Sequence, residues 1–477
     1  MKKRAFAAGK AHYALAMKLL AALSIICTPI LLLDNSPQAV PRNINMSKRH
    51  GNEAETAMAV SHTNPLLITT VSNIESGAGT FHAWSTDGGR TWNNDIIADG
   101  DALGFSCCDG QLAADDFGNI FFVYLSSSIA VKMAISTDGG ATFQPLPFLD
   151  LPFGLPTGPW RSLAQIGQQV SGDQPSIAAG AGSVWISWTA SNGSVQASGA
   201  PVTGLGQVGT FSPAQRVSGA NGLGDYGDTA IGPNGEVFIV YQTPTGGEGP
   251  ATVYGALDPD GLGPQGFGPG QLIVTSNVGG FDYIPAQSGR SVDIEAGLAW
   301  DRTGGPHNGR LYFIYTSEEP QESNDTDIQF RYSDDKGATW SNSVRVNDDV
   351  GTTSQFNPRL SLDSTTGNIA IAWYDCRNDK GDHGFGDTNG QPNDDTMIYS
   401  TVSKDGGATF SRNRRLSAAA SDDNDAGSGV DYGDYSGFTF YNGRLYFSAA
   451  DNSNSTGDNP DGTLHEFDLY VAPTGAR

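Results

Sequence analysis

Short runs in which apolar and polar residues alternate fill most of the chain after its first 40 residues. Alternation with a period of two is typical of a strand with one buried face. Seven of these runs share a longer pattern, in which a strand, a turn with Gly or Asn and a second apolar strand follow one another. They span residues 55 to 71, 111 to 125, 176 to 189, 229 to 242, 297 to 316, 359 to 374 and 437 to 450. The pattern predicts an all-β protein built from seven similar units.

An eight-residue motif, Ser-x-Asp-x-Gly-x-Thr-(Trp/Phe), occurs four times, each time after such a strand. The copies lie at residues 85 to 92, 136 to 143, 333 to 340 and 403 to 410. Its Asp can accept hydrogen bonds from nearby backbone N–H groups, its Gly tolerates a positive φ, and its closing aromatic ring can pack under the loop. We interpret the motif as a stapled hairpin that belongs to the architecture and not to a catalytic site.

This motif resembles the Asp-box, or BNR repeat, of sialidase-like β-propellers, and the resemblance covers essentially the whole chain after its N-terminal segment. It implies a single β-propeller of stacked four-stranded blades, with the boxes on the outer part of the blades and far from the ligand site. Seven units indicate seven blades; six is the alternative, because known sialidases of this superfamily have six. The seventh unit ends early, so we expect a strand from residues 42 to 47 to complete it and close the ring.

The first 39 residues are predicted to be a signal peptide, which leaves residues 40 to 477 for the propeller. Basic residues precede an apolar run from Leu19 to Leu33, which is short for a bilayer span and fits the h-region of an export signal. An uncleaved anchor is the alternative, because no clean cleavage site follows. We therefore expect a secreted, periplasmic or cell-surface protein that contacts no membrane outside its N-terminal segment.

The charge of the chain restricts its partners. It has 27 basic and 51 acidic side chains and a net charge of −24, which argues against nucleic acid and against anionic membrane surfaces. A carbohydrate or another polar ligand, neutral or cationic, remains compatible with this charge. We expect the protein to be a monomer.

Three cysteines remain after the predicted signal: Cys107, Cys108 and Cys376. An odd number in an exported protein leaves at least one thiol or one intermolecular bond to be explained. The adjacent pair could form a vicinal disulfide or remain as two free thiols, and both alternatives stay open.

Residues just before the first strand of each unit should converge at the central funnel of a propeller. Alignment of the seven units places one residue of each in the same column: Glu55, Asp109, Gln174, Tyr226, Glu295, Asn357 and Tyr435. The preceding column contains Cys108, Asp173, Asp225 and Asp434, and Arg359 follows Asn357 by two positions. Carboxylates, amides and tyrosines in a ring are typical of a polar-ligand or sugar site. The alternative is that they satisfy backbone groups at the strand ends and water in the channel.

The resemblance implies what an active sialidase would need: three arginines that hold the substrate carboxylate, a Tyr nucleophile polarised by a Glu, and an Asp as acid and base. The first arginine belongs to a Phe/Tyr-Arg-Ile-Pro motif, where this sequence has acidic residues between Asn52 and Ala57. We therefore expect no arginine triad and no sialidase activity. Six arginines lie in the last three blades and would weaken this expectation if they reached the funnel from loops: Arg290, Arg302, Arg310, Arg359, Arg377 and Arg444.

Two functions from different classes remain. In the first, which we favour, the funnel binds a glycan or another polar surface ligand through Glu55, Asp173, Asp225, Tyr226, Asn357, Arg359 and Asp434, without catalysis. In the second, the protein is a glycoside hydrolase, either exo-sialidase-like or of another specificity. Asp109 and Glu295 would then be its acid and base, and Tyr435 a further catalytic residue.

The interpretation requires no cofactor, but two acidic stretches are candidates for Ca²⁺ because dense carboxylates are the hard oxygen ligands that this ion prefers. They contain Asp375, Asp379, Asp382 and Asp387, and Asp422, Asp423, Asp425 and Asp431. Neither stretch reproduces a full Asp-x-Asp-x-Asp-Gly loop. We therefore predict no metal ligand and interpret the stretches as solvated acidic loops, with Ca²⁺ as the alternative.

Overall fold

The structure is a computed structural model that describes residues 42 to 147, 171 to 217, 223 to 424, 426 to 427 and 431 to 475. The predicted signal peptide lies outside the described residues. In the part of the chain that is described, no helix is long and apolar enough to span a membrane.

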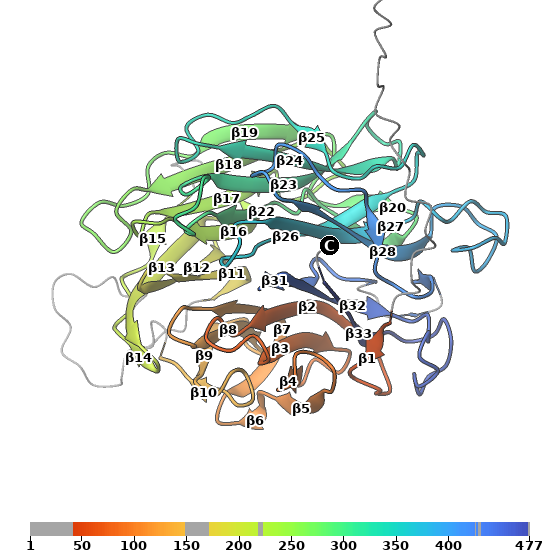
Figure 1. Cartoon of the computed structure of the whole chain (residues 1–477), viewed down its shortest axis with the longest axis horizontal. Helices are drawn as coiled ribbons and strands as arrows, with labels where there is room; N and C mark the ends of the chain where they lie inside the picture. The colour runs from red at the N-terminus through yellow and green to blue at the C-terminus, as the bar shows by residue number, and fades with distance from the viewer. Residues whose placement is uncertain (1–41, 148–170, 218–222, 425, 428–430, 476–477) are drawn as a thin grey trace, which may run out of the picture. The chain divides into compact units, whose positions relative to one another are not determined.

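Seven antiparallel sheets, which we number as blades in chain order, make up the fold (Figure 1). The first blade contains β2 (Glu53–Val60), β3 (Ile68–Ile74), β4 (Thr80–Ser85) and β5 (Asn93–Ile97). The second contains β7 (Gly104–Ala114), β8 (Ile120–Ser126), β9 (Val131–Ser136) and β10 (Gln144–Pro145), and β6 (Asp99–Asp101) pairs with β7. The third contains β11 (Gly172–Gly180), β12 (Ser183–Ala190) and β13 (Val195–Gly204), with β14 (Gln207–Val208) and β15 (Gln215–Arg216) both paired to β13.

The remaining four blades repeat this order. The fourth contains β16 (Asp225–Ile231), β17 (Val237–Thr243), β18 (Ala251–Asp258) and β19 (Gln271–Ser276); the fifth contains β22 (Gly297–Trp300), β23 (Leu311–Glu318), β24 (Thr326–Ser333) and β25 (Val344–Arg345). The sixth contains β26 (Gln355–Leu362), β27 (Ile369–Asp375) and β28 (Asp395–Ser403), with β29 (Arg414–Arg415) and β30 (Ser421–Asp422) both paired to β28. The seventh contains β31 (Gly437–Tyr441), β32 (Arg444–Asp451), β33 (Asp468–Gly475) and β1 (Ile44–Asn45).

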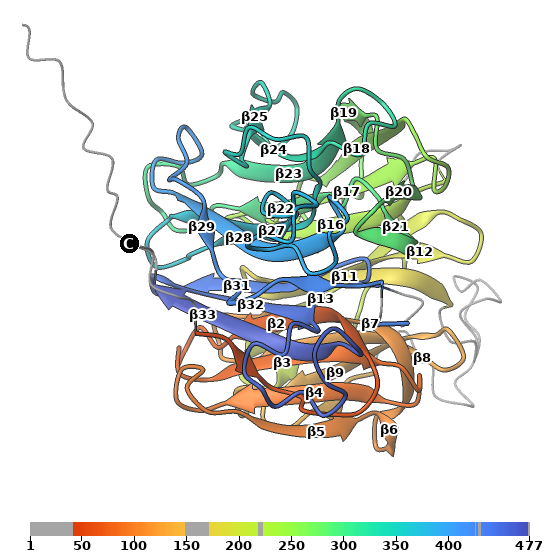
Figure 2. The ribbon, with the colours of Figure 1, turned by 90° about the vertical axis from the view of Figure 1, so that its right-hand side faces the viewer.

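The first strands of neighbouring blades lie side by side and form a closed ring. The order is β2, β7, β11, β16, β22, β26 and β31, and β31 in turn contacts β2. Figure 2 shows the blue strands of the seventh blade between β28 of the sixth and β2 of the first. The predicted all-β propeller with seven blades is therefore confirmed, and the six-bladed alternative is wrong.

The ends of the described chain meet in the seventh blade. Its outer strand is β1, where Ile44 pairs with Val471 and Asn45 with Tyr470. Asp468 reinforces the seam because it accepts hydrogen bonds from Asn45 Nδ2 at 2.5 Å and from Ser47 Oγ at 2.9 Å. Residues 42 to 47 thus contain the strand that completes this sheet.

The core lies between the blades. All residues of β8 and of β27 are buried, because each of these second strands is covered by the blades on both sides. This explains why their sequences are nearly continuous apolar runs, whereas an exposed sheet face would show strict alternation. Burial of a side chain the size of Phe122 contributes roughly 1.5 to 3 kcal/mol.

All four boxes use the same hydrogen bonds. The Ser Oγ donates to the first Asp oxygen at 2.7 to 2.9 Å, and the Thr Oγ1 donates to the second at 2.5 to 2.7 Å. The Thr backbone N–H also donates to the Asp, at 2.8 to 3.0 Å. The glycines at the fifth position have φ between +79° and +89°, which favours glycine. The closing ring packs between blades: Phe143 of the second blade contacts His82 of the first.

Candidate functional site

The column of residues predicted at the funnel coincides with a repeated backbone feature. Five of its members have a left-handed backbone, with φ of +53° at Glu55, +58° at Asp109, +45° at Gln174, +49° at Glu295 and +48° at Asn357. Register shifts occur at the same place in β2, β7, β11, β16 and β26. A bulge of this kind bends the strand and redirects a side chain. The bulges therefore define the lining of the funnel.

The three column carboxylates each connect their own blade to a neighbour. Asp109 Oδ2 accepts the backbone N–H of Gln174 at 3.0 Å, and Glu55 Oε1 accepts that of Asp434 at 3.3 Å. The backbone N–H of Asn357 likewise bonds to the Glu295 carboxyl. These three carboxylates therefore satisfy backbone N–H groups. This is the alternative given above, in which the column residues serve the strand ends and not a ligand.

A hairpin that the seven-unit pattern does not contain brings an arginine to the funnel. It consists of β20 (Asp282–Ile284) and β21 (Gln287–Val292) and lies between the fourth and fifth blades in the sequence. Arg290 makes two hydrogen bonds to the Asp434 carboxylate, one of them from Nε at 2.8 Å, and its Nη2 lies 3.8 Å from Glu55 Oε1. Arg290 is one of the six arginines that loops could bring to the funnel, but alignment of the units could not single it out, because the hairpin has no counterpart in the other blades.

The other side of this hairpin is fixed to the segment before the seventh blade. Asp431 Oδ2 accepts the N–H groups of Gly289 and Arg290 at 2.8 and 2.9 Å. Gln287 Nε2 donates to Gly433 O at 3.2 Å. These hydrogen bonds fasten the hairpin to the segment that contains Asp431 and Gly433, and they thereby fix the position of Arg290.

Arg359 is the second arginine at the funnel. Its guanidinium carbon lies 5.5 Å from the centre of the Tyr435 ring, and its charge lowers the pKa of the Glu295 carboxyl against the larger effect of burial. Three of the other arginines considered above bond elsewhere: Arg302 to Ala179 O, Arg310 to Asp334 and Arg377 to Asp375.

Several buried polar atoms in this region have no hydrogen-bond partner among the described residues. They are Glu295 Oε1, Asn357 Oδ1, the Tyr435 hydroxyl and Gln242 Nε2. Glu295, Asn357 and Tyr435 are only 9%, 1% and 7% exposed. Buried polar groups are almost always bonded to protein or to ordered water. These atoms therefore lack the partner that a buried polar group normally has.

Burial and mutual repulsion dominate the electrostatics of the funnel. Burial, followed by the charges of Asp434 and Asp109, raises the pKa of Glu55 well above its usual value. Burial and the charge of Asp173 raise the pKa of Asp109 to about 7. Burial and the charge of Asp293 raise the pKa of Glu295 well above its usual value. Some funnel carboxyls thus hold protons near neutral pH and can donate hydrogen bonds.

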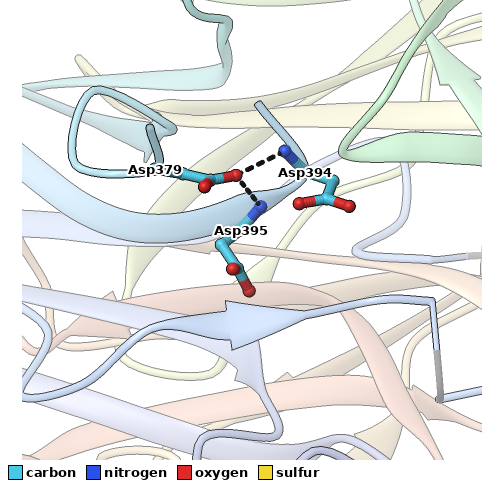
Figure 3. Close-up of side chains that lie close together, drawn as sticks. All are labelled: Asp379, Asp394 and Asp395. Atoms are coloured by element: carbon cyan, nitrogen blue, oxygen red, sulfur yellow. Dashed lines mark hydrogen bonds between the residues drawn. The ribbon is translucent and has the colours of Figure 1, made fainter. Parts of the chain in front are cut away.

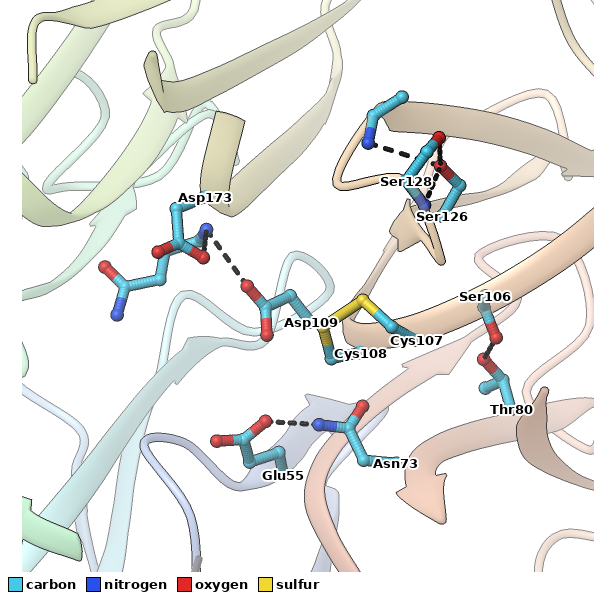
Figure 4. Close-up of a disulfide and its surroundings, with 12 residues drawn as sticks. Glu55, Asn73, Thr80, Ser106, Cys107, Cys108, Asp109, Ser126, Ser128 and Asp173 are labelled. Carbon is cyan, nitrogen blue, oxygen red and sulfur yellow. Dashed lines mark hydrogen bonds between the residues drawn. A yellow bond between two sulfur atoms is a disulfide. The ribbon is translucent and has the colours of Figure 1, made fainter. Parts of the chain in front are cut away.

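Of the remaining predicted residues, Asp173 and Asp225 lie in the same region. Asp173 is exposed, and its Oδ1 accepts the N–H of Gln174 at 3.1 Å; Figure 4 shows it near Asp109 and Glu55. Asp225 accepts a hydrogen bond from Thr189 Oγ1 at 2.7 Å. Tyr226 lies in β16, but its side chain is outside the described part of the structure.

Two further acids were not predicted. Asp228 accepts hydrogen bonds from Ser176 Oγ and from the backbone N–H of Leu298, both at 2.8 Å, and so links three blades. Asp293 faces the funnel, where burial and the charge of Asp434 raise its pKa well above the usual value. Asp228 follows Tyr226 by two positions, and Asp293 precedes Glu295 by two positions. This spacing is the only sequence signal that could have identified the two acids.

Of the two alternatives for the adjacent cysteines, the structure has the disulfide: Cys107 and Cys108 are bonded to each other. The bond lies directly before Asp109 in the chain and beside it in space (Figure 4). Cys376 is a buried free thiol.

A second acidic cluster lies over the sixth blade and is made by Asp379, Asp394 and Asp395 (Figure 3). Asp422 approaches it, because Asn389 Nδ2 donates both to Asp394 and to Asp422, at 3.1 and 3.0 Å. Burial is the largest of the effects that raise the pKa of Asp394 to about 6 and that of Asp395 to about 7.

The acidic stretches proposed from the sequence contribute unequally to this cluster. Asp375 is paired with Arg377, and Asp382 is exposed. Asp387 accepts backbone N–H groups within its own loop, and Asp425 lies outside the described residues. The interpretation of these acids as solvated holds for Asp382 and is wrong for the other described members, which are buried: Asp375, Asp379, Asp387, Asp422, Asp423 and Asp431.

No family model matches the chain, and no curated protein matches it in sequence. Solved structures are similar in fold. The polysaccharide lyase Uly1 is 10% identical over 90% of each chain, with a TM-score of 0.49. The Hadza microbial sialidase Hz136 is 13% identical over 86% of this chain and 74% of its own, with a TM-score of 0.43. The BP39L lectin from Burkholderia pseudomallei is 10% identical over 76% and 84%, with a TM-score of 0.46. At these identities the likeness concerns the propeller fold alone.

Proposed function

We propose that this protein is an exported Asp-box propeller that binds a glycan or a similar polar ligand at its funnel and does not transform it. The observation that supports the proposal is the set of buried, unpartnered polar atoms on Glu295, Asn357 and Tyr435. Leaving such an atom unbonded costs about 1 to 3 kcal/mol. A ligand that supplies hydroxyl groups recovers part of this cost.

The chemistry of these atoms favours a sugar. Glu295 Oε1 and Asn357 Oδ1 can accept hydrogen bonds from hydroxyls, and the Tyr435 hydroxyl can donate or accept one. The surrounding carboxylates disfavour an anionic ligand. Arg290 does not compensate for them toward a ligand, since its guanidinium is already bonded to Asp434. A neutral or cationic carbohydrate is therefore the best match.

Binding of neutral oligosaccharides tests this function. We expect a glycan array to identify ligands for the wild-type protein and calorimetry to show that Glu295→Gln weakens binding about 3- to 10-fold, because the amide places an NH₂ group where the carboxyl has an oxygen and one neutral hydrogen bond contributes about 0.5 to 1.5 kcal/mol. Asp334→Asn is the matched control, because Asp334 is an exposed acid that pairs with Arg310 outside the funnel. Equal binding by both variants, or no ligand for the wild-type protein, would contradict the proposal.

A glycoside hydrolase remains the second candidate, because Asp109 with a pKa of about 7 suits a general acid. Glu295 would be the base. Its principal charged neighbours are Asp293, Arg359 and Asp434, and the charge of Asp434 also acts on Asp109. Burial and nearby carboxylates raise the pKa of Tyr435 well above its usual value, which works against a phenolate nucleophile.

A panel of fluorogenic glycosides separates the two candidates. We expect no turnover, and in particular no release of sialic acid from a sialoside. Turnover that is abolished by Glu295→Gln and retained by Asp334→Asn would establish the hydrolase.

A further inference from the structure

The buried acidic cluster over the sixth blade is assembled from three points of the chain. Asp379 lies in the long loop after β27, Asp394 and Asp395 lie at the start of β28, and Asp422 lies in β30, opposite Asp395 in the sheet. The four side chains are 1%, 7%, 1% and 4% exposed. Acidic residues at this degree of burial normally have a charged partner.

The oxygens of this cluster are spaced for one large cation. One oxygen each from Asp379, Asp394 and Asp395 lies within 4.8 Å of the others. Ca²⁺ binds oxygen at about 2.3 to 2.6 Å, so that two ligands on opposite sides of the ion are about 4.6 to 5.2 Å apart. Asp379 Oδ2 also accepts the N–H groups of Asp394 and Asp395, at 2.8 and 3.0 Å. These bonds hold the three carboxylates in place before any ion binds.

An independent observation points to a ligand. Asp394 Oδ1 is buried and has no hydrogen-bond partner among the described residues, and Figure 3 shows a carboxylate oxygen of Asp394 directed toward Asp379 and Asp395. None of the ion pairs between described residues includes any of the four acids. Their hydrogen-bond partners include backbone N–H groups and neutral side chains such as Thr388, Asn389 and Asn424.

We propose that Asp379, Asp394 and Asp395 bind one Ca²⁺ ion, with Asp422 as a nearby fourth carboxylate. The ligand set consists of oxygen alone, which suits Ca²⁺ better than Zn²⁺, whose protein sites nearly always include His nitrogen or Cys sulfur. Mg²⁺ fits less well, because it requires near-ideal octahedral geometry at about 2.0 to 2.1 Å. This site does not depend on the ligand-binding function proposed above.

The ion would join the loop after β27 to the segment that precedes the seventh blade. Asp422 is followed by the buried Asp423, whose carboxyl lies close to that of Asp431. Asp431 in turn accepts the backbone N–H of Arg290. Bound Ca²⁺ would therefore stabilise the part of the chain that positions Arg290 and Tyr435 at the funnel.

Titration of the full chain with Ca²⁺ after treatment with a chelator tests the site. We expect calorimetry to show one Ca²⁺ per chain, and thermal melts to show a Tm that rises with Ca²⁺ concentration, as for any ligand that binds the native state. Binding of Mg²⁺ should be at least 10-fold weaker. A melt that is identical in chelator and in excess Ca²⁺, or tighter binding of Mg²⁺, would overturn the proposal.

Two variants locate the ion. Asp394→Asn should weaken Ca²⁺ binding at least 10-fold, whereas Asp382→Asn, an exposed acid of the same loop, should leave it unchanged. Circular dichroism in chelator checks that Asp394→Asn folds; if it does not, the wild-type titrations decide the outcome alone. Equal effects of the two substitutions would overturn the assignment.

Discussion

The aspartates of the boxes and the acids of the funnel are the same chemical groups in opposite surroundings. Thr91 and Ser85 donate hydrogen bonds to Asp87 and lower its pKa to about 2, with the backbone N–H of Thr91 as the largest cause. In the funnel, burial raises the pKa of Asp109 to about 7. The box acids are satisfied by their own hairpin and favour the folded state, whereas the funnel acids are kept at a cost in stability. Acids kept at such a cost are candidates for function.

The largest expected effect is on the pH dependence of stability. The folded state holds a proton on Asp109 up to a pKa of about 7, whereas the unfolded chain releases it near 3.9. The free energy of unfolding should therefore fall as the pH rises from about 4 to 7, by about 4 kcal/mol if Asp109 titrates alone. Urea unfolding at several pH values between 4 and 7 measures this fall in the free energy of unfolding.

Asp109→Asn is the variant that isolates this effect, because an amide keeps an acceptor for the N–H of Gln174 and does not titrate. Its stability should fall less between pH 4 and pH 7 than that of the wild-type protein. A wild-type profile that rises through this window, or parallel profiles for the two proteins, would show that Asp109 is not buried as described.

The next largest effect is expected when the aspartate of one box is replaced. Asp138→Ala should destabilise the protein by about 1 to 2 kcal/mol, because it removes the acceptor for the N–H groups of Ala141 and Thr142 as the loss of a helix N-cap does. The same thermal melts should show little change for Asp99→Ala, an exposed acid of the second blade. Ligand binding at the funnel should be unaffected by either substitution, and a loss of binding by Asp138→Ala alone would place the boxes in the site.

The smallest effect compares two buried tyrosines. The Tyr374 hydroxyl donates to Ala450 O at 3.1 Å, so Tyr374→Phe should cost about 1 kcal/mol. The Tyr435 hydroxyl has no partner at good hydrogen-bond geometry among the described residues, although it lies beside the Asp109 carboxyl, so Tyr435→Phe should cost less than Tyr374→Phe in the absence of ligand. Chemical denaturation of both variants at one pH makes the comparison, and an equal cost would mean that Tyr435 is bonded in the free protein.

The strands, the blade number and the funnel column could be predicted from the sequence because they are local patterns that repeat. The column was found by alignment of the units and was expected just before each first strand; the structure places residues such as Glu55 and Asn357 inside the first strands, at a left-handed bulge. Such repetition makes an alignment of the units possible.

The residues that were missed depend on contacts between segments that do not repeat. Arg290 reaches the funnel only because a hairpin found in a single place is bonded to Asp431, more than 100 residues away in the sequence. Asp394 and Asp395 were not considered as ligands, since only the fold places them against Asp379. The sequence also could not predict which carboxyls have a raised pKa, because the packing of the blades decides which of them are buried.

The seam in the seventh blade has a mechanical consequence. β1 runs antiparallel to β33, and the residues before Ile44 leave the pair on the same side as those after Val471. A force that separates the two ends of the ring would therefore peel β1 from β33 one pair at a time, as a zipper opens, and would not shear all pairs together. The strand contributes two paired residues, so the propeller should open first at this seam, while the six blades made of consecutive strands stay intact.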